Sequence, residues 1–170
     1  MVGAMNSASA SINSREFVKI TIDGKIIKGN SKVEQCNDYF DGNCPQAFHA
    51  FASIDGTVFD IVHVKLKVTK EIQQVLEHFF KRGEKDIVIE IVRRESTKSG
   101  SAYSSYKVIY SGCRLHELLL SHDYDTNLSL DMSFSPEESV SLEMNLPSAD
   151  GKSTEKLGPI TYNLYKEMLV

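Results

Sequence analysis

The hydrophobic residues of the chain follow two different periods. Along most of the sequence apolar and polar residues alternate, which is typical of strands with one buried and one solvated face. In residues 62–68, for example, Val62, Val64 and Leu66 are separated by histidine and lysine. This alternation predicts a mainly β protein.

Residues 70–82 interrupt the alternation with a helical period. Apolar side chains recur there every three or four residues, which places them along one side of a helix. Thr69 is a candidate N-cap, and Gly83 supplies a stop after the last turn. The predicted core face of this helix consists of Ile72, Val75, Leu76, Phe79 and Phe80.

Three glycines mark expected turns and bends. Asp23-Gly24 and Asp55-Gly56 each stand between alternating runs. Both predict hairpins, because the two central residues of a type I′ turn need a positive φ. Gly112 lies inside a further alternating run and predicts a bulge or bend in that strand.

The second half of the chain adds further strands. Residues 128–134 and 140–146 alternate strictly and predict two separate strands, whereas residues 148–158 predict a loose loop. Residues 160–170 form a short apolar end that docks as strand or helix. With roughly seven or eight short strands and hairpin-length links, the sequence predicts an antiparallel two-sheet β-barrel or sandwich. One α-helix, at about residues 70–82, flanks it.

Length, charge and composition mainly exclude classes of function. The 170 residues suit one domain. We expect that domain at residues 16–170, behind residues 1–15, which read as a disordered arm or a cloning remnant. The net charge of −4 argues against non-specific nucleic-acid binding, and no apolar run is long enough for membrane insertion. The N-terminus also lacks the basic and apolar regions of a signal peptide.

The cysteines offer only weak candidate chemistry. Cys36, Cys44 and Cys113 are odd in number, which favours free thiols in a reducing compartment. A disulfide between Cys36 and Cys44 stays open. These two residues with His49 lack the close ligand spacing of a zinc site.

Two other clusters fail on their position in the sequence. The residue types of a catalytic group occur at Cys113, His116 and Glu117. We reject this group, because Cys113 lies in a predicted strand and no nucleophile motif surrounds it. Residues 122–127 match the start of a calcium loop, but the glycine and the bidentate glutamate of that loop are missing. The sequence therefore predicts no catalytic, cofactor-binding or metal site, and favours a binding or assembly protein over an enzyme.

Three stretches, in a fixed order, carry a resemblance to a known family. They are VKITIDGK at 18–25, the basic strand that runs into the helix and the following strand at 62–95, and the strand pair at 106–144. Their order over residues 17–146 resembles the hemolysin-coregulated protein (Hcp) family. That family forms the tube of type VI secretion systems and is related to phage tail-tube proteins.

The resemblance implies a structural role without a cofactor. In the family, protomers join edge to edge into hexameric rings, and the rings stack into a hollow tube that a contractile sheath propels out of the cell. It implies sheath, spike and baseplate proteins as partners, and effector proteins as cargo of the lumen. It also implies export from the bacterial cytoplasm to the extracellular space or a target cell without a signal peptide.

By family analogy, residues 35–53 are the loop that contacts the neighbouring ring. The candidate contact residues are the aromatic side chains Tyr39, Phe40, Phe48 and Phe51. An equally open alternative is that these rings close one end of the barrel.

A second hypothesis belongs to a different class of protein. A monomeric β-barrel with a helix as its lid could bind a small apolar ligand or a secretion partner. Oligomeric state separates the two hypotheses.

Overall fold

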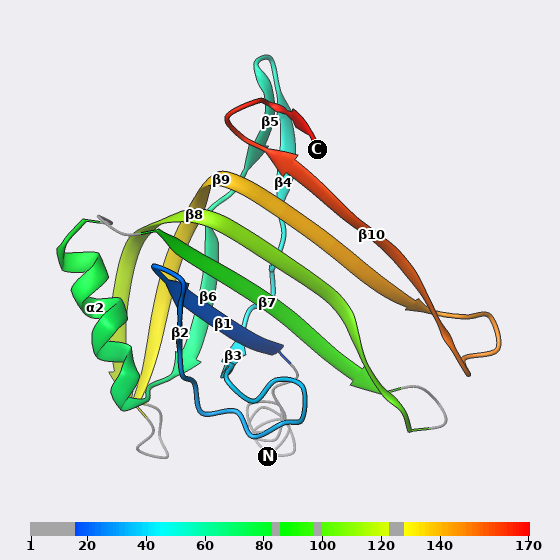
Figure 1. The fold of residues 1–170 in the computed structure, drawn as a ribbon, viewed down its shortest axis with the longest axis horizontal. Coiled ribbons are helices and arrows are strands. Elements are labelled where there is room, and N and C mark those ends of the chain that lie inside the picture. Colours follow the sequence, from blue (N-terminus) through cyan, green and yellow to red (C-terminus); the bar gives the residue numbers. More distant parts are fainter. Residues whose placement is uncertain (1–15, 83–85, 97–99, 123–127) are drawn as a thin grey trace, which may run out of the picture.

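The computed structural model of the chain describes residues 16–82, 86–96, 100–122 and 128–170. It is mainly β with one short helix, as the sequence predicts (Figure 1). In chain order the elements are β1 (Glu16–Ile22), β2 (Lys25–Ile27), β3 (Phe40–Asn43), β4 (Ala50–Ser53), β5 (Gly56–Phe59), β6 (Val62–Lys67), the 3-10 turn η1 (Lys70–Ile72), α2 (Gln73–Phe80), β7 (Ile87–Ser96), β8 (Ala102–His122), β9 (Leu128–Pro147), β10 (Thr154–Asn163) and β11 (Met168–Leu169).

The main sheet closes into a barrel. Strand β9 pairs with β6 on one side and with β8 on the other, so the circuit β9–β6–β3–β1–β7–β8 returns to its start. The pairings within this circuit are antiparallel. Strands β4 and β5 form a separate two-stranded sheet. Closure leaves few open strand edges, which makes the remaining ones informative.

Two strands are much longer than the sequence predicts. Strand β8 has 21 residues and β9 has 20, and they pair along nearly their whole length. The prediction of two strands at 128–134 and 140–146 is therefore wrong, because β9 continues through Pro136. That proline lies opposite Cys113, beside a bulge at Gly112, and proline is tolerated at such a position. The predicted bend at Gly112 is confirmed, with φ +62°.

The C-terminal segment is also more regular than expected. Residues 154–158, predicted as part of a loose loop, belong to β10, which pairs with residues 139–147 of β9. Their side chains are mostly exposed on both faces of the strand. Apolar and polar residues therefore do not alternate there, and the sequence does not predict a strand. Backbone pairing with β9 orders this polar stretch instead.

The alternating residues of the barrel strands form one core. Val62, Val64 and Leu66 of β6 are buried opposite Phe134, Met132 and Leu130 of β9. The ring of Tyr110 packs edge-on against Phe134 at a centroid distance of 5.4 Å. Within the described residues, no helix is long and apolar enough to cross a membrane.

The helix presents a different face from the predicted one. Ile72 and Val75 are buried in the core, and Leu76 packs against it. Phe80 is 75% exposed, so its predicted place on the core face is wrong. His78 is buried instead, with 5% exposed. Because an α-helix turns about 100° per residue, His78 lies about 60° from Val75 around the axis and Phe80 about 140°. The fifth apolar residue therefore lies beyond the buried face.

The predicted helix ends are only partly described. Thr69 occupies the N-cap position of η1, but its hydroxyl makes no cap bond and instead donates to the carbonyl of Lys28 at 3.1 Å. The predicted cap is therefore a tether between the helix start and the segment after β2. Gly83, the predicted stop, lies outside the described residues, as do residues 1–15.

Candidate functional site

The hairpin of β4 and β5 projects from the barrel (Figure 1). Its four residue pairs end at Ser53 and Gly56, so Ile54 and Asp55 are the two turn residues. The turn is one residue earlier than predicted, since Gly56 follows it. The first Asp-Gly turn is as predicted, because Asp23 and Gly24 both have a positive φ between the paired residues Ile22 and Lys25.

Apolar side chains concentrate on this hairpin and beside it. Ile54 is fully exposed at the tip, and other large apolar side chains nearby are half exposed, namely Phe48, Phe51, Val58 and Ile61. An exposed group of this kind on a projecting element is typical of a protein interaction site. Ile54 was not among the predicted contact residues, because the predicted contact loop ended at residue 53 and only its aromatic side chains were chosen.

Polar contacts fasten the base of the hairpin. The backbone N–H of Asp60 donates to the carbonyl of His49 at 3.0 Å, and the two side chains are joined at 2.9 Å between Nδ1 and Oδ2. The hydrogen bond with His49 lowers the pKa of the Asp60 carboxyl, as does the backbone N–H of Ile61. Deeper in the protein, the hydroxyl of Tyr110 donates to the carbonyl of Ala47.

The four predicted contact aromatics do not lie together. Phe48 and Phe51 belong to the hairpin region, but Phe40 is fully buried on β3, which corrects its predicted role as a loop contact. Tyr39 is half buried, and its hydroxyl donates to a carboxylate oxygen of Glu90. Burial and this bond raise the pKa of Tyr39. These two aromatics belong to the barrel wall because the short strand β3 places them there.

A second exposed feature is the outer edge of β10. On that side, within the described residues, β11 pairs only with Tyr162 and Asn163. Residues 154–160 therefore present backbone groups without a strand partner there. Exposed apolar side chains accompany this edge and the segment after it, namely Leu157, Ile160, Tyr165, Met168, Leu169 and Val170. An edge of this kind is a template for pairing with another chain.

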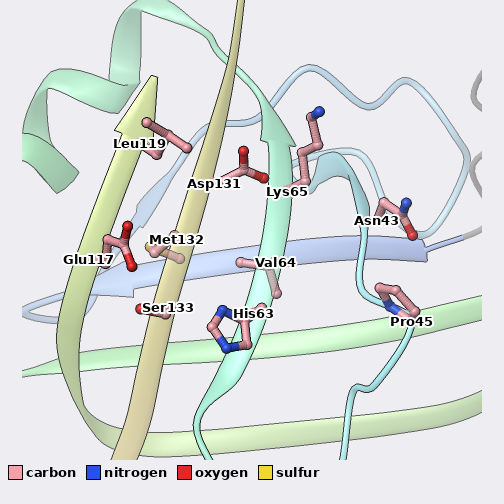
Figure 2. A pocket seen from close by; sticks show the side chains of 10 residues that line it. All are labelled: Asn43, Pro45, His63, Val64, Lys65, Glu117, Leu119, Asp131, Met132 and Ser133. Atoms are coloured by element: carbon pink, nitrogen blue, oxygen red, sulfur yellow. The ribbon is translucent and has the colours of Figure 1, made fainter. Parts of the chain in front are cut away.

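A groove of about 370 Å³ lies over β6, β8 and β9, on the face opposite the core (Figure 2). Cross-strand neighbours line it: His63 lies opposite Ser133, and Lys65 lies opposite Asp131. Glu117 completes the polar lining on β8. Pro45, Leu119 and Met132 share the lining with these charged and hydroxyl side chains, so the groove is not the enclosed, mainly apolar pocket that suits a small apolar ligand.

The three cysteines are free thiols, as the odd cysteine count favours. Cys36, Cys44 and Cys113 are all free and buried, so the open possibility of a Cys36–Cys44 disulfide is not realised. Burial raises the pKa of Cys44 to about 12, and burial likewise raises the pKa of Cys113. A thiol with a raised pKa is a poor nucleophile at neutral pH.

The other rejected clusters do not form sites in the described structure. Cys113 donates to the carbonyl of Tyr110 at 3.2 Å, whereas His116 Nε2 contacts Ser135 Oγ at 2.8 Å. The weak calcium-loop match at 122–127 lies almost entirely outside the described residues. Among the described residues, no group of three His, Cys, Asp or Glu side chains could hold a metal ion.

Together these features of the described residues define a closed antiparallel barrel with a flanking helix, a projecting apolar hairpin and an open edge along β10. No protein-family model matches the sequence. No curated protein matches it either. Comparison with solved structures, in contrast, finds the same fold in secretion proteins.

The similar structures cover nearly the whole chain. One described as a type six secretion system protein has a TM-score of 0.69 at 12% identity, and covers 91% of this chain and 99% of that one. Hcp1 from Salmonella typhimurium has a TM-score of 0.62 at 9% identity and covers 92% and 99%. A further Hcp protein has a TM-score of 0.62 at 12% identity and covers 87% and 98%. The chain has the fold of the Hcp proteins, and the predicted resemblance is confirmed at the level of the fold.

Proposed function

We propose that this chain is a structural tube subunit of a type VI secretion system. In this proposal protomers join edge to edge into hexameric rings, and the rings stack into a hollow tube. The subunit is exported with the tube, and its partners are other copies of itself, the sheath, spike and baseplate proteins, and effector proteins that the lumen can hold. Its role is structural rather than enzymatic.

The observation that carries the proposal is the projecting β4–β5 hairpin. Its fully exposed tip residue, Ile54, and its half-exposed neighbours Phe51 and Val58 form an apolar surface on a thin, two-stranded element. A stable monomer gains nothing from holding such a surface in water, whereas a stacked ring buries it. The open edge of β10 supports lateral joining in the same way, because its backbone groups can pair with a neighbouring protomer.

The alternative of a monomeric barrel that binds a small apolar ligand has less support. The barrel interior is filled by large side chains, including Tyr110, Phe40 and Phe134, each of which is almost completely buried. The groove of Figure 2 lies on the barrel surface and mixes charged and hydroxyl side chains with apolar ones, so it is not an enclosed apolar pocket. The described structure therefore favours contacts between surfaces over ligand binding.

Light scattering after size exclusion, followed by negative-stain imaging of the peak, tests the proposal. A hexamer has a mass of about 114 kDa, six times the 19.0 kDa of the chain. Rings of this mass that stack into tubes at higher concentration are the expected result. A monomer of 19.0 kDa across a wide range of concentration would overturn the proposal.

A further inference from the structure

The orientation of the β4–β5 hairpin depends on a small number of contacts at its base. An isolated two-stranded hairpin is marginal in water, so the elements it packs against decide where it points. Its own ladder contains only four residue pairs, from Ala50–Phe59 to Ser53–Gly56. The contacts that join it to the barrel are therefore the ones that can position it.

A row of side chains across three strands lies at this base. Val140 of β9 is paired with Tyr110 of β8 on one side and with Tyr162 of β10 on the other. Tyr110 donates its hydroxyl to the carbonyl of Ala47, before the hairpin begins. The ring of Tyr162 packs against Phe59, where the hairpin ends, at a centroid distance of 5.5 Å.

Tyr162 also extends along β5 towards the tip. A Cβ atom placed on Gly56 would lie 3.9 Å from the Tyr162 hydroxyl oxygen. Gly56 and Phe59 are the first and last residues of β5, so one side chain approaches both ends of that strand. Phe59 in turn contacts Phe48 edge-on at 6.0 Å, which extends the same aromatic cluster to the loop that leads into the hairpin.

Tyr110 and Tyr162 differ in what else they do. Tyr110 is almost completely buried and belongs to the barrel core, whereas Tyr162 is only partly buried. The strand that carries Tyr162 is held to β9 by backbone pairing on both sides of this residue. Loss of the Tyr162 ring therefore removes a contact with the hairpin and leaves the barrel core intact.

We propose that Tyr162 is the positioning residue of the hairpin and acts through its aromatic ring, so that the last long strand sets the direction in which the hairpin meets a neighbouring ring of protomers. The inference rests on the proposed function. It also links two assembly steps, because β10 carries Tyr162 and the open edge. Pairing of that edge with a neighbouring protomer immobilises β10, and through Tyr162 it immobilises the hairpin that stacks the rings.

Three variants test this inference. Tyr162→Ala removes the ring, and Tyr162→Phe keeps the ring and removes only the hydroxyl. Tyr165→Ala is the matched control, since it removes a tyrosine that is 76% exposed in the following turn. Hydrogen exchange of the amides of residues 50–59 reports the hairpin, and exchange of the β7 and β8 amides reports the barrel.

The expected result separates the hairpin from the barrel. In Tyr162→Ala, exchange in the hairpin rises by a factor of about 2 to 10, the range for loss of one aromatic pair, while the β7 and β8 amides are unchanged. Tyr162→Phe and Tyr165→Ala exchange like the unmodified protein. Tubes imaged by negative stain become shorter only for Tyr162→Ala, with rings still present.

Two results would overturn the inference. One is unchanged hairpin exchange in Tyr162→Ala, and the other is an equal rise in Tyr162→Phe, which would assign the effect to the hydroxyl. The exchange measurement does not need rings, so it decides the role of Tyr162 even if the unmodified protein is a monomer. A monomer would overturn the proposed function, whereas unchanged exchange would overturn only the role of Tyr162.

Discussion

Glu16 and Arg93 face each other across the β1–β7 ladder and form an ion pair of 3.1 Å between Oε1 and Nη1. The other carboxylate oxygen of Glu16 accepts the backbone N–H of Cys44. One buried carboxylate thus connects two barrel strands to the segment that leads into the projecting hairpin.

Substitutions at Glu16 separate its two roles. Glu16→Gln removes the charge but keeps an acceptor for Cys44, so we expect a loss of about 1 kcal/mol of unfolding free energy for this partly exposed pair. Glu16→Ala leaves a buried N–H unpaired, which adds about 1–3 kcal/mol. Urea denaturation measures both. Equal losses in the two variants would mean that the bond to Cys44 contributes no stability.

Glu95→Gln is the matched control for the charge. Glu95 also pairs with Arg93, at 3.2 Å, but it is more exposed than Glu16. We expect a change within about 0.5 kcal/mol, because exposed ion pairs contribute little.

Gly112 is the second position where one substitution should have a large effect. It has φ +62°, and a Cβ there would lie 2.7 Å from the Cβ of Glu138. Gly112→Ala should therefore cost about 1–3 kcal/mol for the backbone conformation and a further amount for the clash. Gly24→Ala is the comparison, because Gly24 has φ +77° with nothing within 4 Å of its Cβ position. Thermal unfolding should rank Gly112→Ala as the less stable variant, and the reverse order would contradict the steric argument.

The regular parts of the fold could be predicted from periodicity. Alternation identified β6 because Val62, Val64 and Leu66 all face the core. It failed for β9 because residues 135–139 are polar and contain Pro136, which resembles a turn. What keeps β9 continuous is the pairing of Pro136 with Cys113 beside the Gly112 bulge, a relationship between distant residues that periodicity does not contain.

The candidate site was predictable only in part. Phe48 and Phe51 stood out as aromatics without a period, and both are exposed in the hairpin region. Phe40 also stood out as an aromatic without a period, but it is buried. Only tertiary contacts distinguish this buried aromatic from the exposed Phe48 and Phe51. Tyr162 gave no signal, because its contact with Phe59 joins residues about a hundred positions apart and depends on β10 pairing beside the hairpin. No local pattern reports such a contact.

Alkaline pH should destabilise the protein. Burial raises the pKa of Tyr39, Tyr106 and Tyr110 above the ordinary value of 10.0, so these residues stay protonated in the folded chain. Their contribution is fully present below pH 10 and is lost as the pH rises further, because only the unfolded chain then releases the protons. Above pH 10, each of these tyrosines lowers the unfolding free energy by about 1.4 kcal/mol per pH unit for as long as it stays protonated in the folded chain.

Urea denaturation at several pH values from about 9 to 11.5 measures this slope. Tyr39→Phe removes one ionisable group at the surface of the barrel, so its stability should fall less steeply above pH 10 than that of the unmodified protein. Equal slopes would show that Tyr39 ionises as readily in the folded chain as in the unfolded chain.

A charge at the hairpin tip should block stacking without affecting the protomer. Ile54 is fully exposed and makes up half of the two-residue turn, so Ile54→Asp should change the unfolding free energy by less than about 0.5 kcal/mol. Burying the new carboxylate between rings costs several kcal/mol, which should raise the protein concentration needed for tubes by at least about 100-fold. Phe80→Asp is the control, since it places the same charge on the exposed face of α2, away from the hairpin (Figure 1). Light scattering against concentration should separate the two variants, and tubes of normal length from Ile54→Asp would exclude the hairpin tip as the stacking contact.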